Sequence, residues 1–213
     1  MTSPVSATYL DAADVVADFI ASPAVAASWD RPSALPQMSV RGLAGHLARQ
    51  ITRAPETLGA DRVDEPPIRL IEHYQRSAWA VKPVDDPVNV AIRDAGEDAA
   101  PDGPAVLAKQ VQDAIADLRT MLAEEPLERT VWIPWAGWNL TLEDYLSTRL
   151  LEIVVHVDDL AVSVDVAPPA LPEQATDSTL MLLTCLAARR HGVAPVLRAL
   201  SRQERAQGSI AAI

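Results

Sequence analysis

The side chains best suited to chemistry are a glutamate and a histidine four residues apart, Glu152 and His156. At that spacing on a helix, a carboxylate oxygen and an imidazole nitrogen can converge on one point. Two ligands do not hold a metal well, so a third ligand would come from a facing helix, and His46 is the candidate. Gly42 and Gly45 precede it and would allow a neighbouring helix to approach closely. Two histidines and a glutamate with an open fourth position form a ligand set suited to catalytic zinc.

The helix predicted to carry this pair, residues 142–164, is apolar nearly all round, which indicates that it is buried. It nevertheless has a stripe of polar side chains, namely Tyr145, Arg149, Glu152, His156 and Ser163. Burying charged groups costs free energy unless each is paired or bound to a metal. Spacing alone leaves a second interpretation open, in which a hydrogen bond between Glu152 and His156 satisfies both groups without a metal.

Two members of this stripe are candidate catalytic residues, Arg149 and Tyr145. Arg149 lies one turn before Glu152 and can orient that carboxylate or bind an anionic group. A structural ion pair with a buried carboxylate is the alternative for Arg149. Tyr145 and the tryptophan-rich segment 131–139 can border the mouth of a pocket, although hydrophobic packing under a loop also accounts for the tryptophans.

Proline rather than glycine punctuates the chain (17 against 8), and strand-like alternation is almost absent, so we expect an all-α fold. Four long helices are predicted to form a bundle: 7–27, 39–55, 105–123 and 142–164. We also expect two short helices and a C-terminal helix: 68–81, 195–200 and 173–190. The acidic segment 82–104 has no clear period and is predicted to be a surface loop or a mobile flap. In this scheme the metal-binding bundle spans 1–167, and the helix and tail of 168–213 pack on the same domain.

The other reactive side chains are assigned structural roles. His73 has no evident partner and is predicted to be exposed. Cys185 lies in an apolar run and is predicted to be an inert, buried thiol. Asp158 and Asp159 are expected to brace the end of their helix, and the carboxylates of 85–102 to form a solvated surface.

Composition excludes several classes of protein. The 213 residues carry 18 basic and 29 acidic side chains, a formal net charge of −11. This argues against a protein that binds nucleic acids or anionic membranes, because both need a basic face. The N-terminal stretch lacks the basic region of a signal peptide, and no apolar run is long enough for a membrane span. With one cysteine, no internal disulfide is possible, and we expect a cytoplasmic protein.

Two runs of sequence resemble a known family. The first joins Trp29-Asp30-Arg31-Pro32 to Ser39-Val40-Arg41-Gly42-Leu43-Ala44-Gly45-His46. The second is Trp135-Ala136-Gly137-Trp138-Asn139, followed by Arg149-Leu150-Leu151-Glu152 and His156-Val157-Asp158-Asp159. Both are similar to the mycothiol-dependent maleylpyruvate isomerase N-terminal domains, which belong to the DinB/YfiT-like superfamily of metal-binding bundles.

The resemblance implies a DinB-like four-helix bundle that holds a divalent metal, usually zinc, through His46, Glu152 and His156. It also implies mycothiol as a cosubstrate, whose metal-activated thiolate isomerises or conjugates a small electrophile. The isomerase has a further C-terminal domain, whereas fewer than fifty residues follow Pro168 here. We therefore expect a stand-alone thiol transferase or a specialised pathway enzyme rather than an enzyme acting on maleylpyruvate.

Two alternative functions remain at this point. One keeps the metal but replaces the thiol by metal-activated water, for hydrolysis or a proton shift. The other is a non-catalytic metal-binding stress protein. The expected partners are a small-molecule substrate and a low-molecular-weight thiol, with no nucleic acid or membrane, and the chain is expected to be a monomer or a homodimer.

Overall fold

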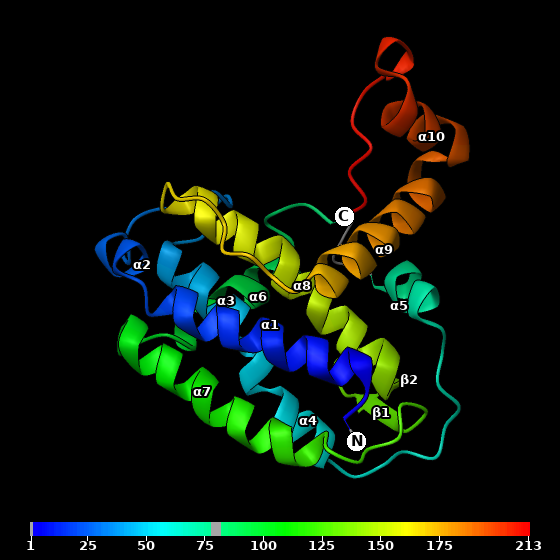
Figure 1. Cartoon of the computed structure of the whole chain (residues 1–213). Helices are drawn as coiled ribbons and strands as arrows, with labels where there is room; N and C mark the ends of the chain where they lie inside the picture. The colour runs from blue at the N-terminus through cyan, green and yellow to red at the C-terminus, as the bar shows by residue number, and fades with distance from the viewer. Residues whose placement is uncertain (1, 78–81) are drawn as a thin grey trace.

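The computed structural model describes residues 2–77 and 82–213 and has an all-α, DinB-like fold (Figure 1). The helices are α1 (Pro4–Ile20), α2 (Pro23–Ala27), α3 (Val40–Thr52), α4 (Ala54–Gly59), α5 (Leu70–Arg76), α6 (Pro87–Asp98), α7 (Pro104–Met121), α8 (Leu142–Ser163), α9 (Glu173–His191) and α10 (Val193–Ser201). A 3-10 turn, Gln203–Arg205, follows α10. A single pair of strands, β1 (Thr130–Ile133) and β2 (Trp138–Thr141), precedes α8. No described helix combines the length and apolarity that a membrane crossing requires.

The predicted bundle is formed by α1, α3, α7 and α8, which pack around one core. Each helix contributes fully buried aliphatic side chains, among them Ile20, Leu43, Leu118 and Leu146. Burying one such side chain stabilises the fold by roughly 1.5–3 kcal/mol. This core fixes the spacing between α3 and α8, the two helices that carry the candidate ligands.

Several helix boundaries differ from the prediction because prolines begin helices here. The predicted helix 7–27 is divided into α1 and α2, and the side chain of Ser22 caps α2 with Pro23 in its first turn. In the same way, Pro55 lies in the first turn of α4 instead of ending α3. A proline at the first helical position loses no hydrogen bond and has a suitable φ. Pro55, which was predicted to end a helix, therefore begins one, and Pro23 begins a helix within a segment that was predicted to be continuous.

The segment 82–104 contains a helix, so the predicted loop or flap is wrong. Its helix α6 packs closely against α3. A Cβ atom added at Gly45 would clash with the backbone oxygen of Gly96, and one added at Gly96 would lie 2.5 Å from the oxygen of Gly42. The glycines before His46 thus admit a neighbour as predicted, and that neighbour is α6.

The carboxylates of 85–102 are not all solvated, because Glu97 of α6 is held by the start of α3. It accepts hydrogen bonds from Ser39 Oγ (2.5 Å) and Arg41 Nε (2.9 Å). Ser39 also caps α3 by accepting from the backbone N–H of Gly42. Glu97 therefore joins the capping contacts that fix the N-terminus of the helix carrying His46.

The tryptophan-rich segment is a β-hairpin and not an irregular loop. Strands β1 and β2 pair in antiparallel register from Thr130 opposite Thr141 to Ile133 opposite Trp138. Gly137 takes a positive φ of 79° in the turn, a conformation that glycine adopts easily. Thr141 ends β2 and caps α8 by accepting from the backbone N–H of Asp144 (3.1 Å), as its sequence position predicts. The hairpin is thus continuous with the helix that carries Glu152 and His156.

The C-terminal helices form an extension from the bundle. Helix α9 packs against α8 as far along as Leu186, which is buried beside Leu151, and then continues to α10, which stands away from the bundle (Figure 1). The tail returns along α9, where His191 Nε2 lies 2.8 Å from the backbone oxygen of Ala211. Cys185 is exposed on α9, so the prediction of a buried thiol is wrong. The helix predicted over 68–81 is observed as α5, and residues 78–81 lie outside the described residues.

Candidate metal centre

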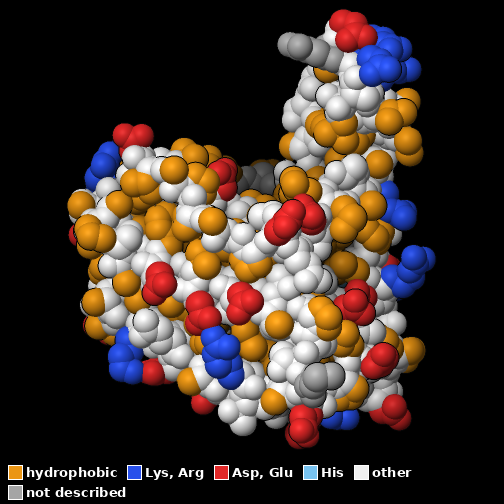
Figure 2. All heavy atoms as spheres, in the orientation of Figure 1, with side chains coloured by type: hydrophobic (Ala, Val, Ile, Leu, Met, Phe, Trp, Pro, Cys, Tyr) orange, Lys and Arg blue, Asp and Glu red, His pale blue; other side chains and the backbone are white. Residues whose placement is uncertain are grey.

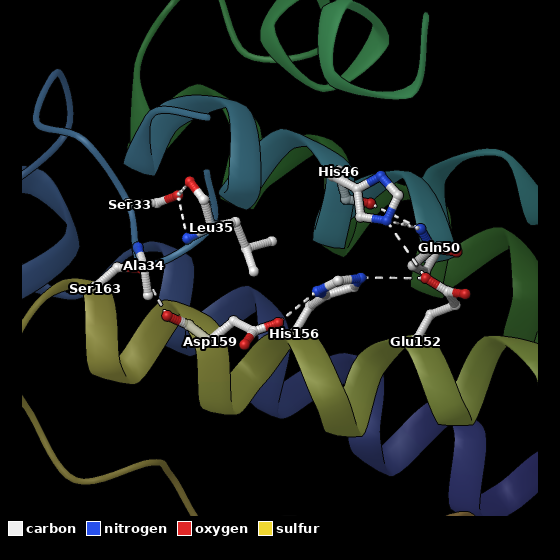
Figure 3. Close-up of polar contacts among 9 residues, drawn as sticks. All are labelled: Ser33, Ala34, Leu35, His46, Gln50, Glu152, His156, Asp159 and Ser163. Atoms are coloured by element: carbon white, nitrogen blue, oxygen red, sulfur yellow. Dashed lines mark hydrogen bonds and ion pairs between the residues drawn. The ribbon is translucent and has the colours of Figure 1, made fainter. Parts of the chain in front are cut away.

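Helices α3 and α8 bring the three predicted ligands together, and we call His46, Glu152 and His156 the candidate metal centre (Figure 3). Glu152 Oε2 lies 3.4 Å from His46 Nε2 and 3.3 Å from His156 Nε2. One donor atom from each of the three residues lies within 4.8 Å of the others. The two imidazole rings stand at 90° to each other with centroids 4.8 Å apart. The i,i+4 spacing on α8 and the position of His46 on α3 thus produce the predicted convergence.

The geometry of these atoms fits a small tetrahedral cation. Zinc–nitrogen and zinc–oxygen bonds of about 2.0–2.1 Å place adjacent tetrahedral ligands roughly 3.3 Å apart, close to the spacings around Glu152. Two imidazoles and one carboxylate suit zinc and similar transition metals better than magnesium or calcium. The side chains are 14–18 % exposed, so they are largely covered without being sealed from solvent.

Asp159 orients His156 from the side away from Glu152. Its Oδ2 lies 2.9 Å from His156 Nδ1, one turn along α8. The Nδ1–H donates to this carboxylate, which leaves Nε2 directed toward Glu152. A carboxylate in this position fixes the tautomer of a metal-binding histidine and raises its basicity. The expectation that Asp159 only braces the helix end is therefore replaced by a direct contact with a candidate ligand.

The two histidines of the centre titrate differently. Burial alone would lower the pKa of His156, but its hydrogen bonds to Asp159 and Glu152 raise that pKa to about 9. Burial lowers the pKa of His46, and its hydrogen bond to Glu152 does not fully offset the burial and the neighbouring His156. Burial would raise the pKa of Glu152, yet the hydrogen bonds from His156 and His46 hold it well below its ordinary value. Without a cation, His156 therefore carries the proton that balances the charge of Glu152.

Gln50, one turn after His46, connects the centre to Arg149. Its Nε2 donates to the backbone oxygen of His46 (2.9 Å) and lies 3.3 Å from His46 Nε2. Its Oε1 accepts from Arg149 Nη1 (2.8 Å). Arg149 Nε donates to Thr148 Oγ1 (3.1 Å). Among the described residues, the ion pairs do not include Arg149, so the structural ion pair considered for it is not observed.

Tyr145 supports Arg149 from the core. Its side chain is 5 % exposed, and the Arg149 guanidinium lies 5.6 Å from the centre of its ring. Burial raises the pKa of the Tyr145 hydroxyl. The residue therefore lies within the core and not at an open mouth, and its catalytic role stays a prediction.

His73 is buried, which contradicts the prediction that it is exposed. It is 2 % exposed, and its Nδ1 accepts a hydrogen bond from Trp138 Nε1 (3.1 Å). Its ring lies edge-on to Tyr74 and Trp135 as well. Burial lowers the pKa of His73 to about 4, and the nearby charge of Arg149 acts in the same direction. Two tryptophans of the hairpin, Trp135 and Trp138, thus pack against a neutral histidine.

A shallow recess lies along the loop between α2 and α3. It measures about 520 Å³ and is lined by Asp30 and residues 32–39, none of which is a ligand of the candidate metal centre. The loop is attached to α8 because the backbone N–H of Ala34 donates to Ser163 Oγ (2.8 Å). Ser163, the last member of the predicted polar stripe, therefore holds this loop and does not belong to the centre (Figure 3).

Sequence reasoning missed the contacts of Gln50 and Asp159 with the centre and the burial of His73. Signals for the first two were available, since Gln50 follows His46 by four residues and Asp159 follows His156 by three. The environment of His73 depends on how the hairpin folds against α5, so no local spacing could indicate it.

Comparisons with known proteins address the family. No curated protein and no solved structure matched the chain. The family model described as the mycothiol maleylpyruvate isomerase N-terminal domain matches residues 9–161, which include all three residues of the candidate metal centre. Because this match spans well over half of the 213 residues, the chain belongs to the mycothiol maleylpyruvate isomerase N-terminal domain family.

Proposed function

We propose that the protein is a metal-dependent thiol transferase or isomerase that uses mycothiol and acts on a small electrophilic substrate. The observation that carries this proposal is the convergence of His46, Glu152 and His156 in a family associated with mycothiol. In this function the three side chains hold Zn²⁺ and leave at least one coordination position open.

The chemistry divides between the cation and the chain. A Zn²⁺ ion held by His46, Glu152 and His156 would supply the positive charge that lowers the pKa of a thiol and favours its deprotonation at neutral pH. Asp159 contacts Nδ1 of His156 and leaves Nε2 directed toward the centre. The side-chain amide of Gln50 donates to the backbone oxygen of His46. The chain's own cysteine, Cys185, is on α9 and not among the residues of the centre, so the reacting sulfur arrives with the cosubstrate.

Arg149 is assigned the recognition of an anionic group. Its side chain is partly buried, and its contacts with Gln50 and Thr148 are to neutral groups. A guanidinium without a carboxylate partner favours an anion nearby, such as a carboxylate of the substrate or of the thiol. The ring of Tyr145 stabilises the position of the Arg149 guanidinium through a cation–π contact.

Metal content and thiol dependence test the proposal together. Purified wild-type protein is expected to contain about one equivalent of zinc by elemental analysis, and His46→Ala and Glu152→Ala are expected to lack it. His191→Ala is a matched control, because His191 is on α9 and outside the centre. The zinc-loaded protein is then titrated with mycothiol by calorimetry and assayed for conjugation of a generic enone or epoxide.

Each result has a defined meaning. Full metal retention by both variants would overturn the assignment of the ligands. Stoichiometric zinc without mycothiol binding or conjugation would overturn the thiol chemistry and favour hydrolysis by metal-activated water. Zinc binding, mycothiol binding and a loss of conjugation in Arg149→Gln with zinc retained would support the whole assignment.

A further inference from the structure

Apolar side chains are concentrated on the surface of the C-terminal extension, residues 180–213, which comprise the end of α9, α10 and the tail and which we call the arm. Five large ones are each 61–70 % exposed: Leu180, Met181, Val193, Leu197 and Leu200. Elsewhere among the described residues, large exposed apolar side chains occur singly or in pairs on separate elements. A cluster of this kind marks an interaction site more often than a free surface.

The pattern of α10 explains why the face is bare. Val193, Leu197 and Leu200 follow the i, i+4, i+7 spacing and lie on one side of the helix. Val196 is 3 % exposed and packs in the groove between α9, α10 and the returning tail, a recess of about 250 Å³. Leu200 lies at the edge of this recess, whereas Val193 and Leu197 are not among the residues that line it.

The charge of the arm differs in sign from that of the rest of the chain. Residues 180–213 contain five arginines and one glutamate, a net charge of +4. The remaining residues, 1–179, which we call the body, contain 13 of the 18 basic and 28 of the 29 acidic residues, a net charge of −15. Figure 2 shows blue side chains gathered on the projecting arm and red ones spread over the body. Among the described ion pairs, Arg205 is the arginine of this segment that has a partner, Glu204.

We propose that the arm docks on the body of a second copy of this chain, so that two copies exchange arms about a two-fold axis. Opposite charge favours this partner, because an arm of +4 meets a body of −15. Pairing two arms with each other would instead oppose two positive surfaces. The exposed leucines of the arm form the apolar contact, and its arginines position the arm by pairing with acidic side chains of the partner.

The exposed end of α8 is the surface on which the partner's arm docks. Val162 and Val166 are 63 % and 39 % exposed there, and the exposed carboxylates Asp158 and Asp165 flank them. This arrangement of apolar side chains beside acidic ones complements the leucines and arginines of the arm. A self-complementary contact of this type closes at two copies and does not continue into a filament.

Sedimentation velocity over a wide range of concentration, at low and high salt, tests the proposal. The wild-type chain is expected to be a dimer that dissociates more readily at high salt. The double variant Leu197→Asp with Leu200→Asp is expected to weaken association at least about tenfold, with an unchanged far-ultraviolet circular dichroism spectrum. Val106→Asp is the matched control, because Val106 is 42 % exposed on α7, away from the arm.

A charge exchange tests the docking surface. Arg198→Asp and Asp165→Arg, each alone, are expected to weaken the dimer, and the two together to restore it. A wild-type chain that is monomeric at every concentration would overturn the proposal, as would equal weakening by Val106→Asp. Failure of the charge exchange to restore association, with the leucine variant still monomeric, would overturn the assignment of the α8 end.

Discussion

Charged side chains are buried in the candidate metal centre, whereas large apolar side chains are exposed on the arm. In most globular proteins apolar side chains are buried and charged side chains are exposed. The centre departs from this rule by covering charged groups, and the arm by exposing apolar ones. In the centre, Glu152 and two histidines lie close enough to share one cation. On the arm, the leucines of α10 lack a cover within the described chain. A different partner is proposed for each region: an ion for the centre and a second copy of the chain for the arm.

The largest expected effect is on metal affinity. Replacing Glu152 by alanine removes the single carboxylate of the centre and leaves two histidines, so zinc affinity should fall at least about a thousandfold, or about 4 kcal/mol. Competition with a chromogenic chelator measures this. Glu143→Ala is the control, because Glu143 is exposed in the first turn of the same helix. A similar affinity in wild type and Glu152→Ala would mean that the buried charges serve the fold alone.

In the metal-free protein, His73 and His156 should affect the free energy of unfolding in different ranges of pH. The pKa of His73 is lowered to about 4, so its contribution is complete above its ordinary value of about 6.5 and is lost as the pH falls toward 4. The pKa of His156 is raised to about 9, so its contribution is complete below about 6.5 and is lost as the pH rises toward 9. We call these pH-dependent changes the acid limb (His73) and the alkaline limb (His156). Each changes the free energy of unfolding by about 3 kcal/mol.

Urea denaturation at a series of pH values checks these two limbs. Zinc should remove the alkaline limb, since the cation replaces the proton on His156. The acid limb of His73 is measured without zinc, because protonation of the ligands releases the cation in acid. For the same reason zinc affinity should increase as the pH rises toward 9. If zinc leaves the alkaline limb in place, His156 is not a ligand.

The contact between α3 and α6 should be sensitive to one methyl group. Gly45→Ala forces a Cβ atom against the backbone of Gly96, and we expect a loss of about 1–3 kcal/mol in the free energy of unfolding. Gly59→Ala adds the same methyl group where no atom lies within 4 Å and should be neutral or slightly stabilising. Equal effects of the two substitutions in thermal denaturation would show that α6 does not fix the helix that carries His46.

Asp159→Asn should have a smaller effect than loss of a ligand. The amide can still contact His156 but does not raise its basicity, so zinc affinity should fall about 10–100-fold while the stoichiometry stays the same. Asp158→Asn, at the exposed neighbouring position, controls for the change of charge. If Asp159→Asn binds zinc as tightly as wild type, the contact to His156 Nδ1 serves only the helix.

The smallest expected effect is that of the arm on the stability of the isolated chain. Leu197→Asp at low protein concentration should change the free energy of unfolding by no more than about 0.5 kcal/mol, because the side chain is exposed. Thermal denaturation at low and high concentration checks this. A large loss at low concentration would show that Leu197 packs within its own chain.

Local spacing predicted the centre better than it predicted the elements around it. The i,i+4 pair on α8 and the glycine-flanked His46 converge because regular helices convert spacing into position. The helix starts at Pro23 and Pro55 were missed because a proline can end one helix or begin the next, and the sequence pattern alone does not distinguish the two. The exposure of Cys185 was missed because the run around it is equally apolar on all sides, and the sequence does not show which side the body covers.

Gln50 affects the affinity of the candidate metal centre for its ligands. Its backbone oxygen accepts from the hydroxyl of Tyr9 on α1, and its amide contacts His46 on α3 and Arg149 on α8. One residue thus immobilises side chains from three helices. The conformational entropy of His46 and Arg149 is lost when the chain folds and not when a ligand arrives. Preorganisation of this kind raises affinity without adding a contact to the ligand.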